Sequence, residues 1–288
     1  ARDEVYRALQ RLLPPESAWP ETLHRAMRYS VFAGGKRLRP ILALAAAEAI
    51  GGEWRPVLEP ACGLELIHTY SLIHDDLPAL DDDATRRGAP SCHVAFGEAV
   101  AILAGDALLT HGLGLFARYP EEEIFAAPKL RVLQAVEEAI GTTGMIGGQV
   151  ADLEAEATGG DVPRELVEKI HENKTGRLIR ASLAVGALLS FAEAEDLDRL
   201  DVFGRAVGLA FQIKDDLLDV ESDSQTLGKR AGKDAAAGKA TFPRALGIEG
   251  SRQMLSRTLE EALSAAASLP RGGGHLPALA LFVGDRRS

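Results

Sequence analysis

Two groups of closely spaced aspartates are the residues of this sequence best suited to chemistry. The first is Asp75-Asp76-Leu-Pro-Ala-Leu-Asp81-Asp82-Asp83 and the second is Asp215-Asp216-Leu-Leu-Asp219. On a helix, Asp215 and Asp219 lie one turn apart and about 40° from each other, so their carboxylates converge. Pro78 should end or kink the preceding helix and let Asp81 turn back toward Asp75. Clusters of carboxylate oxygens favour a hard cation such as Mg²⁺, which leaves positions for water and phosphate.

Each acidic group has a simpler interpretation, in which aspartates cap a helix or are solvated at the surface. That interpretation would be preferred for a single Asp-Asp pair. Here there are two groups, each following an otherwise apolar helical segment. Such a pattern indicates a cleft with a charged rim, and the sequence therefore predicts a carboxylate metal site.

Compact basic groups in glycine-rich or loop settings accompany the acids. They are Gly34-Gly35-Lys36-Arg37-Leu38-Arg39-Pro40, Arg86-Arg87-Gly88, Lys174-Thr175-Gly176 and Gly228-Lys229-Arg230, followed by Lys233 and Lys239. Glycine lets a backbone approach a ligand closely, and Arg and Lys match phosphate oxygens. A polyanionic ligand is indicated, although no group has the spacing of a nucleotide-binding Walker loop. Solvated surface charge is the alternative for each, and it is preferred for Arg230 or Lys233 alone.

Three histidines near the first acidic group have different interpretations. His68 lies seven residues before Asp75, which is two helical turns away on nearly the same face, so it should line the same cleft. His74 is interpreted as a packed or capping residue. His93, beside Cys92, has no partner that would assign it a role.

The elements that position these residues are predicted to be helices. Ala and Leu dominate long stretches while aromatic residues make up only 5% of the chain, a composition that favours helix over strand. Apolar residues recur at helical spacing in segments 61–76, 99–118, 130–146, 165–190 and 202–220. We expect an all-α bundle of about ten helices that forms one domain over residues 1–288. The polar segment 221–243 is predicted to be a mobile lid loop.

Composition and charge exclude several classes of protein. The 288 residues are 46% apolar and 26% charged, which is typical of a globular protein and excludes a disordered one. A net charge of −10 argues against a nucleic-acid partner. Two cysteines without metal spacing favour a reducing compartment, and the cytoplasm is expected. Continuous apolar runs fall short of the roughly 18 residues of a membrane span, and the charged opening lacks a signal-peptide core.

Six motifs in a fixed order carry a resemblance to a known family. They are GGKRLRP, HTYSLIHDDLPALDDDATRRG, GGQ at 147–149, NKTG at 173–176, FQIKDDLLD at 211–219 and TLGKRAGKDAAAGKAT at 226–241. The sequence resembles the short-chain trans-polyprenyl diphosphate synthases, and within them the bacterial farnesyl diphosphate synthases. The resemblance implies an all-α isoprenoid-synthase fold with a deep central cavity, and a homodimer. Leu80 departs from the family pattern, which commonly has Met there.

The resemblance also implies two or three Mg²⁺ ions and a set of site residues. The implied metal ligands are Asp75, Asp81 and Asp215, together with Asp76, Asp216 and Asp219. The residues implied to bind isopentenyl diphosphate are Lys36, Arg39, His68 and Arg87. The resemblance implies that six further residues handle the allylic substrate and act in catalysis together with the main metal ligands. They are Arg86, Lys174, Thr175, Gln212, Lys229 and Lys239.

The implied reaction is the Mg²⁺-dependent condensation of isopentenyl diphosphate with allylic diphosphates. The allylic C–O bond ionises, the double bond attacks the cation, and a proton leaves. Tyr70 lies roughly 7.5 Å before Asp75 along the helix axis, and with the small Ser71 it resembles the feature that stops chain growth at C15. Core packing is the alternative for Tyr70, and a C20 product is the alternative for the enzyme.

Three other functions compete with this one. A terpene cyclase would share the ionisation chemistry but would not need a second diphosphate site. An HD-type metal phosphohydrolase would match the dipeptide His74-Asp75, but the further histidine ligands are missing. A catalytically silent partner subunit would be free to lose its aspartates, and this chain retains both groups.

Overall fold

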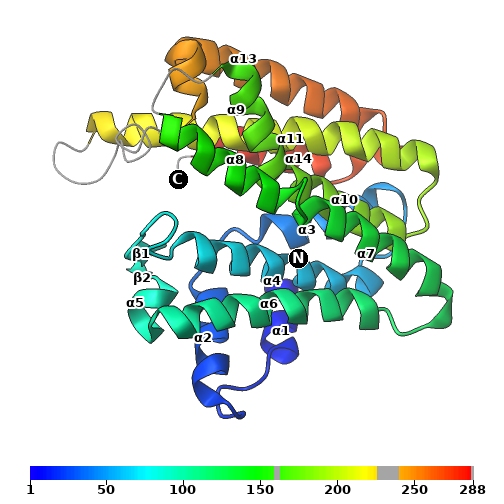
Figure 1. The fold of residues 1–288 in the computed structure, drawn as a ribbon. Helices are drawn as coiled ribbons and strands as arrows, with labels where there is room; N and C mark the ends of the chain where they lie inside the picture. The colour runs from blue at the N-terminus through cyan, green and yellow to red at the C-terminus, as the bar shows by residue number, and fades with distance from the viewer. Residues whose placement is uncertain (159–162, 226–239, 287–288) are drawn as a thin grey trace. The chain divides into compact units, whose positions relative to one another are not determined.

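The structure is a computed structural model that describes residues 1–158, 163–225 and 240–286. Its described part is helical apart from one short hairpin (Figure 1). Contacts group the chain into two compact units. Unit 1 comprises Ala1–Leu44 and Glu53–Leu133, and unit 2 comprises Ala45–Gly52 and Gln134–Ser288. Two of the three divisions fall inside helices α3 (Leu38–Ala49) and α7 (Ala126–Ile140), and the third, between Gly52 and Glu53, lies in the segment after α3.

Unit 1 is built around helices α4 and α6. Its elements are α1 (Arg2–Leu12), α2 (Glu21–Phe32), η1 (Arg55–Val57), α4 (Leu58–Asp75), β1 (Thr85–Arg86), β2 (Ala89–Pro90), α5 (Cys92–Phe96), α6 (Glu98–Arg118) and η2 (Glu123–Phe125). The axes of α4 and α6 approach closely because Gly63 and Gly112 meet at the crossing. A Cβ on Gly63 would lie 2.9 Å from the Gly112 carbonyl oxygen. This packing fixes the end of α4, where the first acidic group begins.

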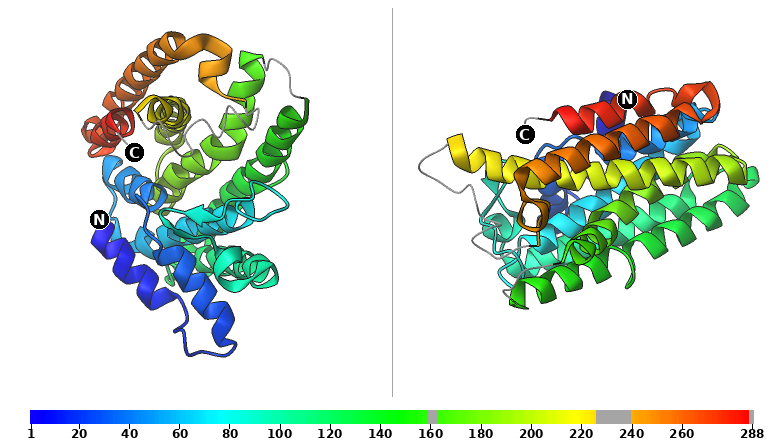
Figure 2. Two further views of the ribbon diagram at one scale, coloured as in Figure 1. Left: turned by 90° about the vertical axis from the view of Figure 1, so that its left-hand side faces the viewer. Right: turned by 90° about the horizontal axis from the view of Figure 1, so that it is seen from above.

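Unit 2 is built around the long helix α11. Its elements are α8 (Met145–Thr158), α9 (Arg164–His171), η3 (Glu172–Gly176), α10 (Arg177–Leu189), α11 (Ala194–Gln225), α13 (Phe242–Ala267), η4 (Pro270–Gly273) and α14 (Leu276–Asp285). Helix α13 runs beside α11, as Figure 2 shows. Glu195 and Asp196 begin α11 and complement its dipole. Pro243 stands in the first turn of α13, where a missing amide hydrogen costs nothing.

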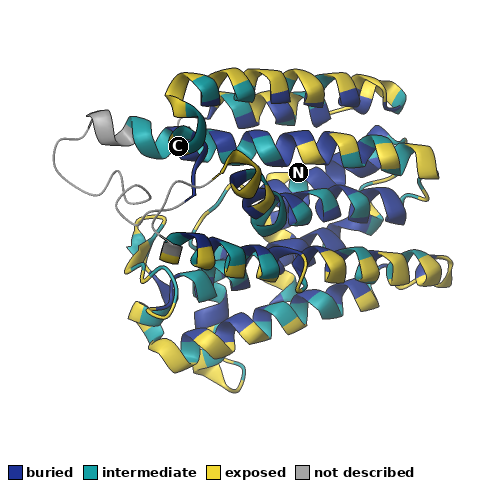
Figure 3. Cartoon of the chain, turned by 45° about the horizontal axis from the view of Figure 1, so that its top comes forward, coloured by how far each residue is buried: buried dark blue, intermediate teal, exposed yellow. Residues whose placement is uncertain are grey.

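The core of unit 2 nearest the second acidic group is a cluster from four helices and the segment that enters α13. Its buried members are Ala155, Val167, Ile170, Ile213, Leu217, Ala240 and Phe242. In Figure 3 the helices carry buried residues along one side and exposed residues along the other. Amphipathic helices of this kind are stabilised by burial of their apolar side rather than by helix propensity alone.

The predicted all-α class is confirmed, with three local differences. Segments 61–76, 99–118 and 202–220 lie almost entirely within α4, α6 and α11, whereas 130–146 ends one helix and begins another. Segment 165–190 is interrupted by a π-helical turn at η3. The β1–β2 hairpin has only two residues per strand, too few for an alternating pattern to reveal it.

Two further expectations are only partly covered by the structure. Most of the expected lid, 221–243, lies outside the described residues; its first residues continue α11 and its last begin α13. Among the described helices, α6 alone is long and apolar enough to cross a membrane by length and composition, although no continuous apolar run suggested it. The same test is passed by core helices, and α6 packs along α4.

Candidate active site

The first acidic group forms a tight turn at the end of α4. The helix ends at Asp75, and the amide of Asp81 donates a hydrogen bond to the Asp75 carbonyl oxygen at 2.8 Å. The amide of Asp83 donates to the Asp76 carbonyl oxygen at 3.2 Å. Pro78 therefore stands where the helix has already stopped, as its chemistry requires. The turn brings Asp81 back to Asp75, which agrees with the geometry expected from the sequence.

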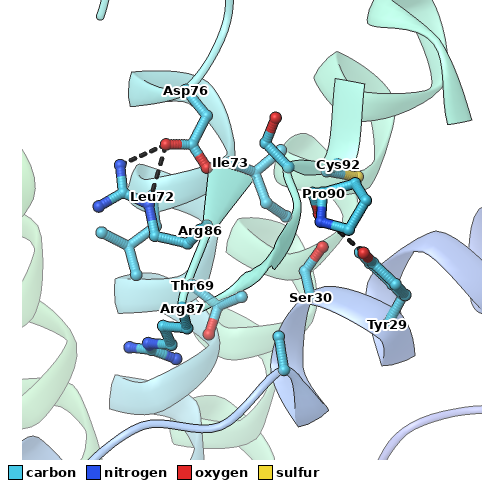
Figure 4. A pocket seen from close by; sticks show the side chains of 12 residues that line it. Tyr29, Ser30, Thr69, Leu72, Ile73, Asp76, Arg86, Arg87, Pro90 and Cys92 are labelled. Atoms are coloured by element: carbon cyan, nitrogen blue, oxygen red, sulfur yellow. Dashed lines mark hydrogen bonds and ion pairs between the residues drawn. The ribbon is translucent and has the colours of Figure 1, made fainter. Parts of the chain in front are cut away.

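Asp76 points into the protein and holds Arg86. Its side chain is 4% exposed, and its Oδ1 accepts hydrogen bonds from both Nε and Nη2 of Arg86 (Figure 4). Asp83 Oδ2 accepts a longer bond from the same Nη2 at 3.4 Å. Burial alone would lower the pKa of the Arg86 guanidinium, but the hydrogen bond and charge of Asp76, with the charges of Asp75 and Asp81, raise it. Arg86 is thus a fixed cation beside Asp75 and Asp81.

The glycine-rich loop of the first basic motif closes on Arg87. Arg87 Nη1 donates to the Gly34 carbonyl oxygen, and a Cβ on Gly35 would lie 2.7 Å from that nitrogen. Both glycines have positive φ, 104° for Gly34 and 124° for Gly35. No other residue combines that backbone with so small a side chain. GGKRLRP and RRG, far apart in sequence, therefore make one basic group.

Arg37, in the same motif, is buried and stabilises this loop. It is buried, has a positive φ of 54°, and its guanidinium pairs with the buried Glu65 of α4 and donates to the Val31 carbonyl oxygen. A charge buried in this way is stable only when it is fully paired. The next residues of the motif begin α3, with Arg39 buried in the first turn, while Lys36 is exposed.

His68 lies within the field of this basic group. Burial, followed by the charges of Arg39, Arg87, Arg37 and Arg86, lowers the pKa of His68 well below its ordinary value. The imidazole is therefore neutral at neutral pH. A neutral imidazole offers one N–H to a diphosphate oxygen without requiring a further counter-ion. The structure thus brings together His68, Arg39 and Arg87, three of the four residues implied to bind isopentenyl diphosphate.

A small pocket lies beneath Arg86 and Arg87. Its volume is about 30 Å³, and Figure 4 shows the side chains that line it, among them Tyr29, Thr69 and Cys92. This space suits a single water molecule rather than a diphosphate. The Cys92 thiol is buried, and burial raises its pKa. Cys92 is therefore a packing residue.

Tyr70 and His74 occupy one side of α4. Their rings meet edge to face with centroids 5.7 Å apart, and His74 Nε2 lies 3.1 Å from the Ile102 carbonyl oxygen of α6. His74 is therefore a packed residue, as expected. Tyr70 is buried, its hydroxyl has no hydrogen-bond partner among the described residues, and burial with the charge of Asp75 raises its pKa to about 12. Ser71 donates to the His68 carbonyl oxygen at 2.9 Å.

In unit 2, Lys174 and Thr175 lie in the π-helical turn η3. This turn fits between two helices because each offers a glycine. A Cβ on Gly148 of α8 would lie 2.3 Å from the Lys174 amide nitrogen, and one on Gly208 of α11 would lie 3.1 Å from Gly176 Cα. Single π-helical turns inside helices are frequent at functional sites. The GGQ motif therefore contributes a glycine that lets α8 contact the NKTG backbone directly.

The side chain of Lys174 is held by a carboxylate from α8. Lys174 Nζ lies 2.8 Å from Asp152 Oδ2, and both side chains are largely buried. The ion pair restricts a long and flexible side chain to one direction, so less entropy is lost when Lys174 binds an anion. The sequence did not single out Asp152, because it lies three residues beyond the GGQ motif and neither adjacent residue is acidic.

The second acidic group has a partly exposed and a buried aspartate side by side. Asp215 is 42% exposed, and its Oδ1 lies 2.8 Å from Nη1 of the buried Arg286. Arg286 also donates to the Phe211 carbonyl oxygen at 3.0 Å and stacks 4.0 Å above the Phe211 ring. Asp216 is 7% exposed. Its Oδ2 accepts a hydrogen bond from the Phe242 amide at 2.9 Å, which ties the start of α13 to α11.

Gln212 lies one turn before these aspartates and contacts His171. Its Nε2 is 2.9 Å from His171 Nδ1, and the imidazole stacks on the Phe242 ring with centroids 5.3 Å apart. Gln212, Asp215 and Asp219 share one face of α11 through their spacing of three and four residues. The expected site residues Lys229 and Lys239, and the neighbouring Arg230 and Lys233, lie outside the described residues.

The donor set fits Mg²⁺ by its chemistry, since every candidate ligand is a carboxylate oxygen. Within residues 1–158, 163–225 and 240–286, no group of three or more His, Cys, Asp or Glu side chains is arranged to hold a metal ion. Asp75, Asp81, Asp215 and Asp219 are only partly buried. Asp76 and Asp216, in contrast, are buried, and they accept hydrogen bonds from Arg86 and from the Phe242 amide. We therefore retain the first four as proposed ligands and assign the other two a positioning role.

Several residues of the site were missed by sequence reasoning. They are Arg37, Glu65, Asp152, His171 and Arg286. Arg37 sits inside the recognised motif GGKRLRP, and its place in that motif was the available signal. His171 and Arg286 are single residues whose partners lie far away in sequence, 41 positions in one case and 71 in the other. No local pattern marks such pairs.

Comparison with known proteins identifies the family of the chain. Residues 20–270 match the polyprenyl synthetase family. The chain belongs to that family. Among curated relatives of this polyprenyl synthetase, the farnesyl diphosphate synthase of Bacillus subtilis strain 168 is 45% identical over 243 residues, which cover 84% of this chain and 81% of that protein.

Two further relatives are named after geranylgeranyl pyrophosphate, which is a longer product than farnesyl diphosphate. Large subunit 1 of the chloroplastic heterodimeric geranylgeranyl pyrophosphate synthase of Arabidopsis thaliana is 45% identical over 262 residues, 90% of this chain and 70% of that protein. The crystal structure of geranylgeranyl pyrophosphate synthetase from Pyrococcus horikoshii has a TM-score of 0.89 at 32% identity, covering 99% of this chain and 96% of that one. The predicted family and fold are confirmed.

Proposed function

We propose that this polyprenyl synthetase joins isopentenyl diphosphate to dimethylallyl and geranyl diphosphate and releases farnesyl diphosphate. The observation that carries the proposal is the basic group of unit 1. There the exposed Arg87 contacts Gly34 and Gly35, and Arg39 lies close enough to His68 to lower its pKa. Such a group, distinct from the carboxylates, supplies the second diphosphate site that a terpene cyclase does not need.

The first chemical step breaks the bond between the allylic carbon and its diphosphate oxygen. Negative charge grows on the leaving group, so fixed cations accelerate the step more than they strengthen substrate binding. In our proposal Arg86, held by Asp76, and Lys174, held by Asp152, supply two of these cations. Mg²⁺ ions, when bound by Asp75 and Asp81 of unit 1 and by Asp215 and Asp219 of unit 2, would neutralise diphosphate charge and act as Lewis acids.

The second step forms the new carbon–carbon bond. Arg39, His68 and Arg87 hold the diphosphate of isopentenyl diphosphate, so its double bond meets the allylic cation as a bound neighbour rather than by collision. The double bond supplies the electron pair, and the resulting tertiary cation loses a proton to form the new double bond. We assign the released diphosphate as the proton acceptor. Thr175 and Gln212 offer dipoles to the cation without being nucleophilic enough to trap it.

The proposed product is farnesyl diphosphate, with geranylgeranyl diphosphate as the second candidate. Tyr70 favours the shorter product, because a buried aromatic ring one and a half turns before Asp75 can block a growing chain. The relatives do not separate the two, since farnesyl and geranylgeranyl synthases match at equal identity. We assign the blocking role to Tyr70 rather than to Ser71, because the Ser71 side chain is small and donates a hydrogen bond to the α4 backbone.

Product sizing tests the proposed function directly. Purified protein is incubated with Mg²⁺, isopentenyl diphosphate and each of dimethylallyl, geranyl and farnesyl diphosphate, and the products are hydrolysed and separated by chain length. We expect C15 from the first two substrates and little conversion of the third. Accumulation of C20 from all three would replace our choice with geranylgeranyl diphosphate. Release of inorganic phosphate alone would favour a phosphohydrolase, and no turnover a silent subunit.

We also propose a homodimer that works in the cytoplasm. Helix α6 supports the dimer, because it is an apolar helix on which the large side chains of Ile102 and Leu103 are exposed. Large exposed apolar side chains that are grouped on one helix indicate a protein interface. The cytoplasmic location is supported by two thiols, Cys62 and Cys92, which are buried and free rather than paired in a disulfide.

A further inference from the structure

A buried ion pair in unit 1 joins the first basic motif to helix α4. The side chains of Arg37 and Glu65 are only 4% and 2% exposed. Arg37 Nη1 donates to Glu65 Oε1, and Arg37 Nη2 donates to the Val31 carbonyl oxygen near the end of α2. A pair of well-packed apolar residues often stabilises a core as well as a buried ion pair does. Stability alone is therefore a weak explanation for this pair.

The glycine-rich loop before α3 needs support at Arg37. Gly34, Gly35 and Arg37 all have positive φ, of 104°, 124° and 54°. Glycine adopts such a backbone conformation readily, whereas a residue with a side chain does not. A left-handed conformation at an arginine persists only where the surrounding structure holds it. The bonds from the Arg37 side chain to Glu65 and to the Val31 carbonyl oxygen supply that support.

The same loop carries residues of the proposed isopentenyl diphosphate site. Lys36 directly precedes Arg37, and Arg39 follows it by two residues. The carbonyl oxygen of Gly34, three residues before Arg37, accepts a hydrogen bond from Arg87 Nη1. A displacement of Arg37 would therefore move the backbone on which Lys36 and Arg39 stand, and also the carbonyl group that holds Arg87.

Glu65 is a carboxylate close to several cations. Burial lowers the pKa of the Arg87 guanidinium, and among the charges that act on Arg87 the largest is that of Glu65, which raises the pKa. This placement gives Glu65 two opposite effects on an anionic ligand. Its negative charge repels a diphosphate. Its bond to Arg37 holds the loop that presents cations to the diphosphate.

We propose that Glu65 is a positioning residue for isopentenyl diphosphate, and that it acts through Arg37 by anchoring the glycine-rich loop. The inference rests on the proposed function, which gives this loop its ligand. Glu65 donates no bond to the substrate, and it determines where Lys36, Arg39 and Arg87 lie. Because the diphosphate of isopentenyl diphosphate does not leave in the reaction, the anchor strengthens binding in the ground state and the transition state alike.

Calorimetric binding of isopentenyl diphosphate tests the inference, because no condensation takes place without an allylic partner. We expect Glu65→Gln, which keeps the shape and removes the charge, to raise the Kd by about tenfold. In steady-state kinetics the KM for isopentenyl diphosphate should rise by a similar factor while kcat stays within about twofold. An unchanged or lower Kd would overturn the inference, since removal of the negative charge alone would strengthen the binding of an anion.

Two controls show whether the effect is confined to this loop. Glu59→Gln, on the same helix, breaks an ion pair with Arg11 of α1 that does not involve the loop, and its Kd for isopentenyl diphosphate should equal that of the wild type. The second control is a thiolo analogue of dimethylallyl diphosphate, measured with Mg²⁺, whose Kd should be the same in Glu65→Gln and in the wild type. An equal weakening of both ligands in Glu65→Gln would overturn the inference.

A variant of Arg37 keeps the test decisive if Glu65→Gln does not fold. Arg37→Lys retains the charge but loses the planar fork that reaches both Glu65 and the Val31 carbonyl oxygen. Its Kd should rise in the same direction by a smaller factor. When Glu65→Gln folds, the double variant should bind more tightly than independent effects predict, because both changes break one contact. Thermal unfolding monitors the fold, and lower stability with a normal Kd would leave the pair a packing role only.

The binding measurement also separates this inference from the proposed function. If the wild type binds isopentenyl diphosphate but condenses nothing, the proposed function fails and calorimetry still decides the role of Glu65. If the wild type condenses diphosphates and both Glu65→Gln and Arg37→Lys bind normally, the inference alone fails. A wild type that does not bind isopentenyl diphosphate would overturn both.

Discussion

Within each acidic group, two adjacent aspartates differ in burial and in role. Asp75 and Asp215 are partly exposed, whereas Asp76 and Asp216 are buried and accept hydrogen bonds from Arg86 and from the Phe242 amide. Neighbouring residues on a helix point about 100° apart, so one faces the site when the other faces the core. The sequence predicted both groups but not this division, because it depends on which helix covers each side.

Substitution of Asp75 and Asp76 by asparagine should therefore give different results. Asp76→Asn leaves the Arg86 guanidinium without its charged partner and should lower the free energy of unfolding by about 1–3 kcal/mol, in addition to reducing turnover. Asp75→Asn should reduce kcat by orders of magnitude with a smaller effect on stability, because Asp75 is partly exposed. Urea unfolding and steady-state kinetics measure the two effects. Equal losses of stability would contradict the division of roles.

Tyr70 has two candidate roles, one in core packing and one in limiting the length of the product. Its ring contacts His74, which packs on α6, so the geometry supports a packing role as well as a blocking one. We expect Tyr70→Ala to shift the product from C15 toward C20 or longer, because a large side chain below Asp75 is removed. Chain lengths are measured by chromatography after hydrolysis. A destabilised variant that still makes only C15 would leave Tyr70 with packing alone, and Tyr70→Phe is the matched control.

At the scale of elements, helix existence was predictable but helix interruptions were not. The apolar period located α4, α6 and α11 well, since burial of one face repeats at every turn. The π-helical turn η3 has no such period. It depends on Gly148 and Gly208, which allow two other helices to contact its backbone. Lys174 and Thr175 were recognised from their motif, and the structure supplies the reason for the glycines.

Gly148 should be essential for the position of Lys174. In Gly148→Ala the new methyl group would lie 2.3 Å from the Lys174 amide nitrogen, a backbone atom that cannot move independently. We expect lower thermal stability and a strong loss of kcat. Gly114→Ala is the control, because there the nearest atom is the end of the flexible Arg118 side chain, and alanine should stabilise that helix. Normal kinetics in Gly148→Ala would show that η3 tolerates displacement.

At the scale of the whole molecule, the motifs were assigned correctly to one family, yet they are distributed over two compact units. Composition and charge excluded other classes but gave no division of the chain. The units became visible only from contacts between residues far apart in sequence, and two of their three boundaries fall inside α3 and α7 rather than in a loop. Sequence signals for a domain boundary depend on linkers, and none marks the two boundaries that lie inside helices.

The proposed dimer predicts a specific effect of charge on α6. Leu103 is 58% exposed, and Leu103→Asp should convert a dimer into a monomer because a carboxylate would be buried without a partner at the interface. Light scattering coupled to size-exclusion chromatography measures the mass. Leu281→Asp, at an exposed leucine of α14, should remain dimeric. A wild-type monomer, or a dimer that survives Leu103→Asp, would contradict the proposal.

The two cysteines make this chain well suited to distance measurements in solution. Burial is the main cause that raises the pKa of both Cys62 and Cys92, so their thiolates are scarce and inaccessible to maleimide reagents. A cysteine introduced at the exposed Glu121 of unit 1 and another at the exposed Glu249 of unit 2 would then be labelled selectively. Energy transfer between the two dyes would report the separation of the units, before and after addition of Mg²⁺ and a non-reactive diphosphate.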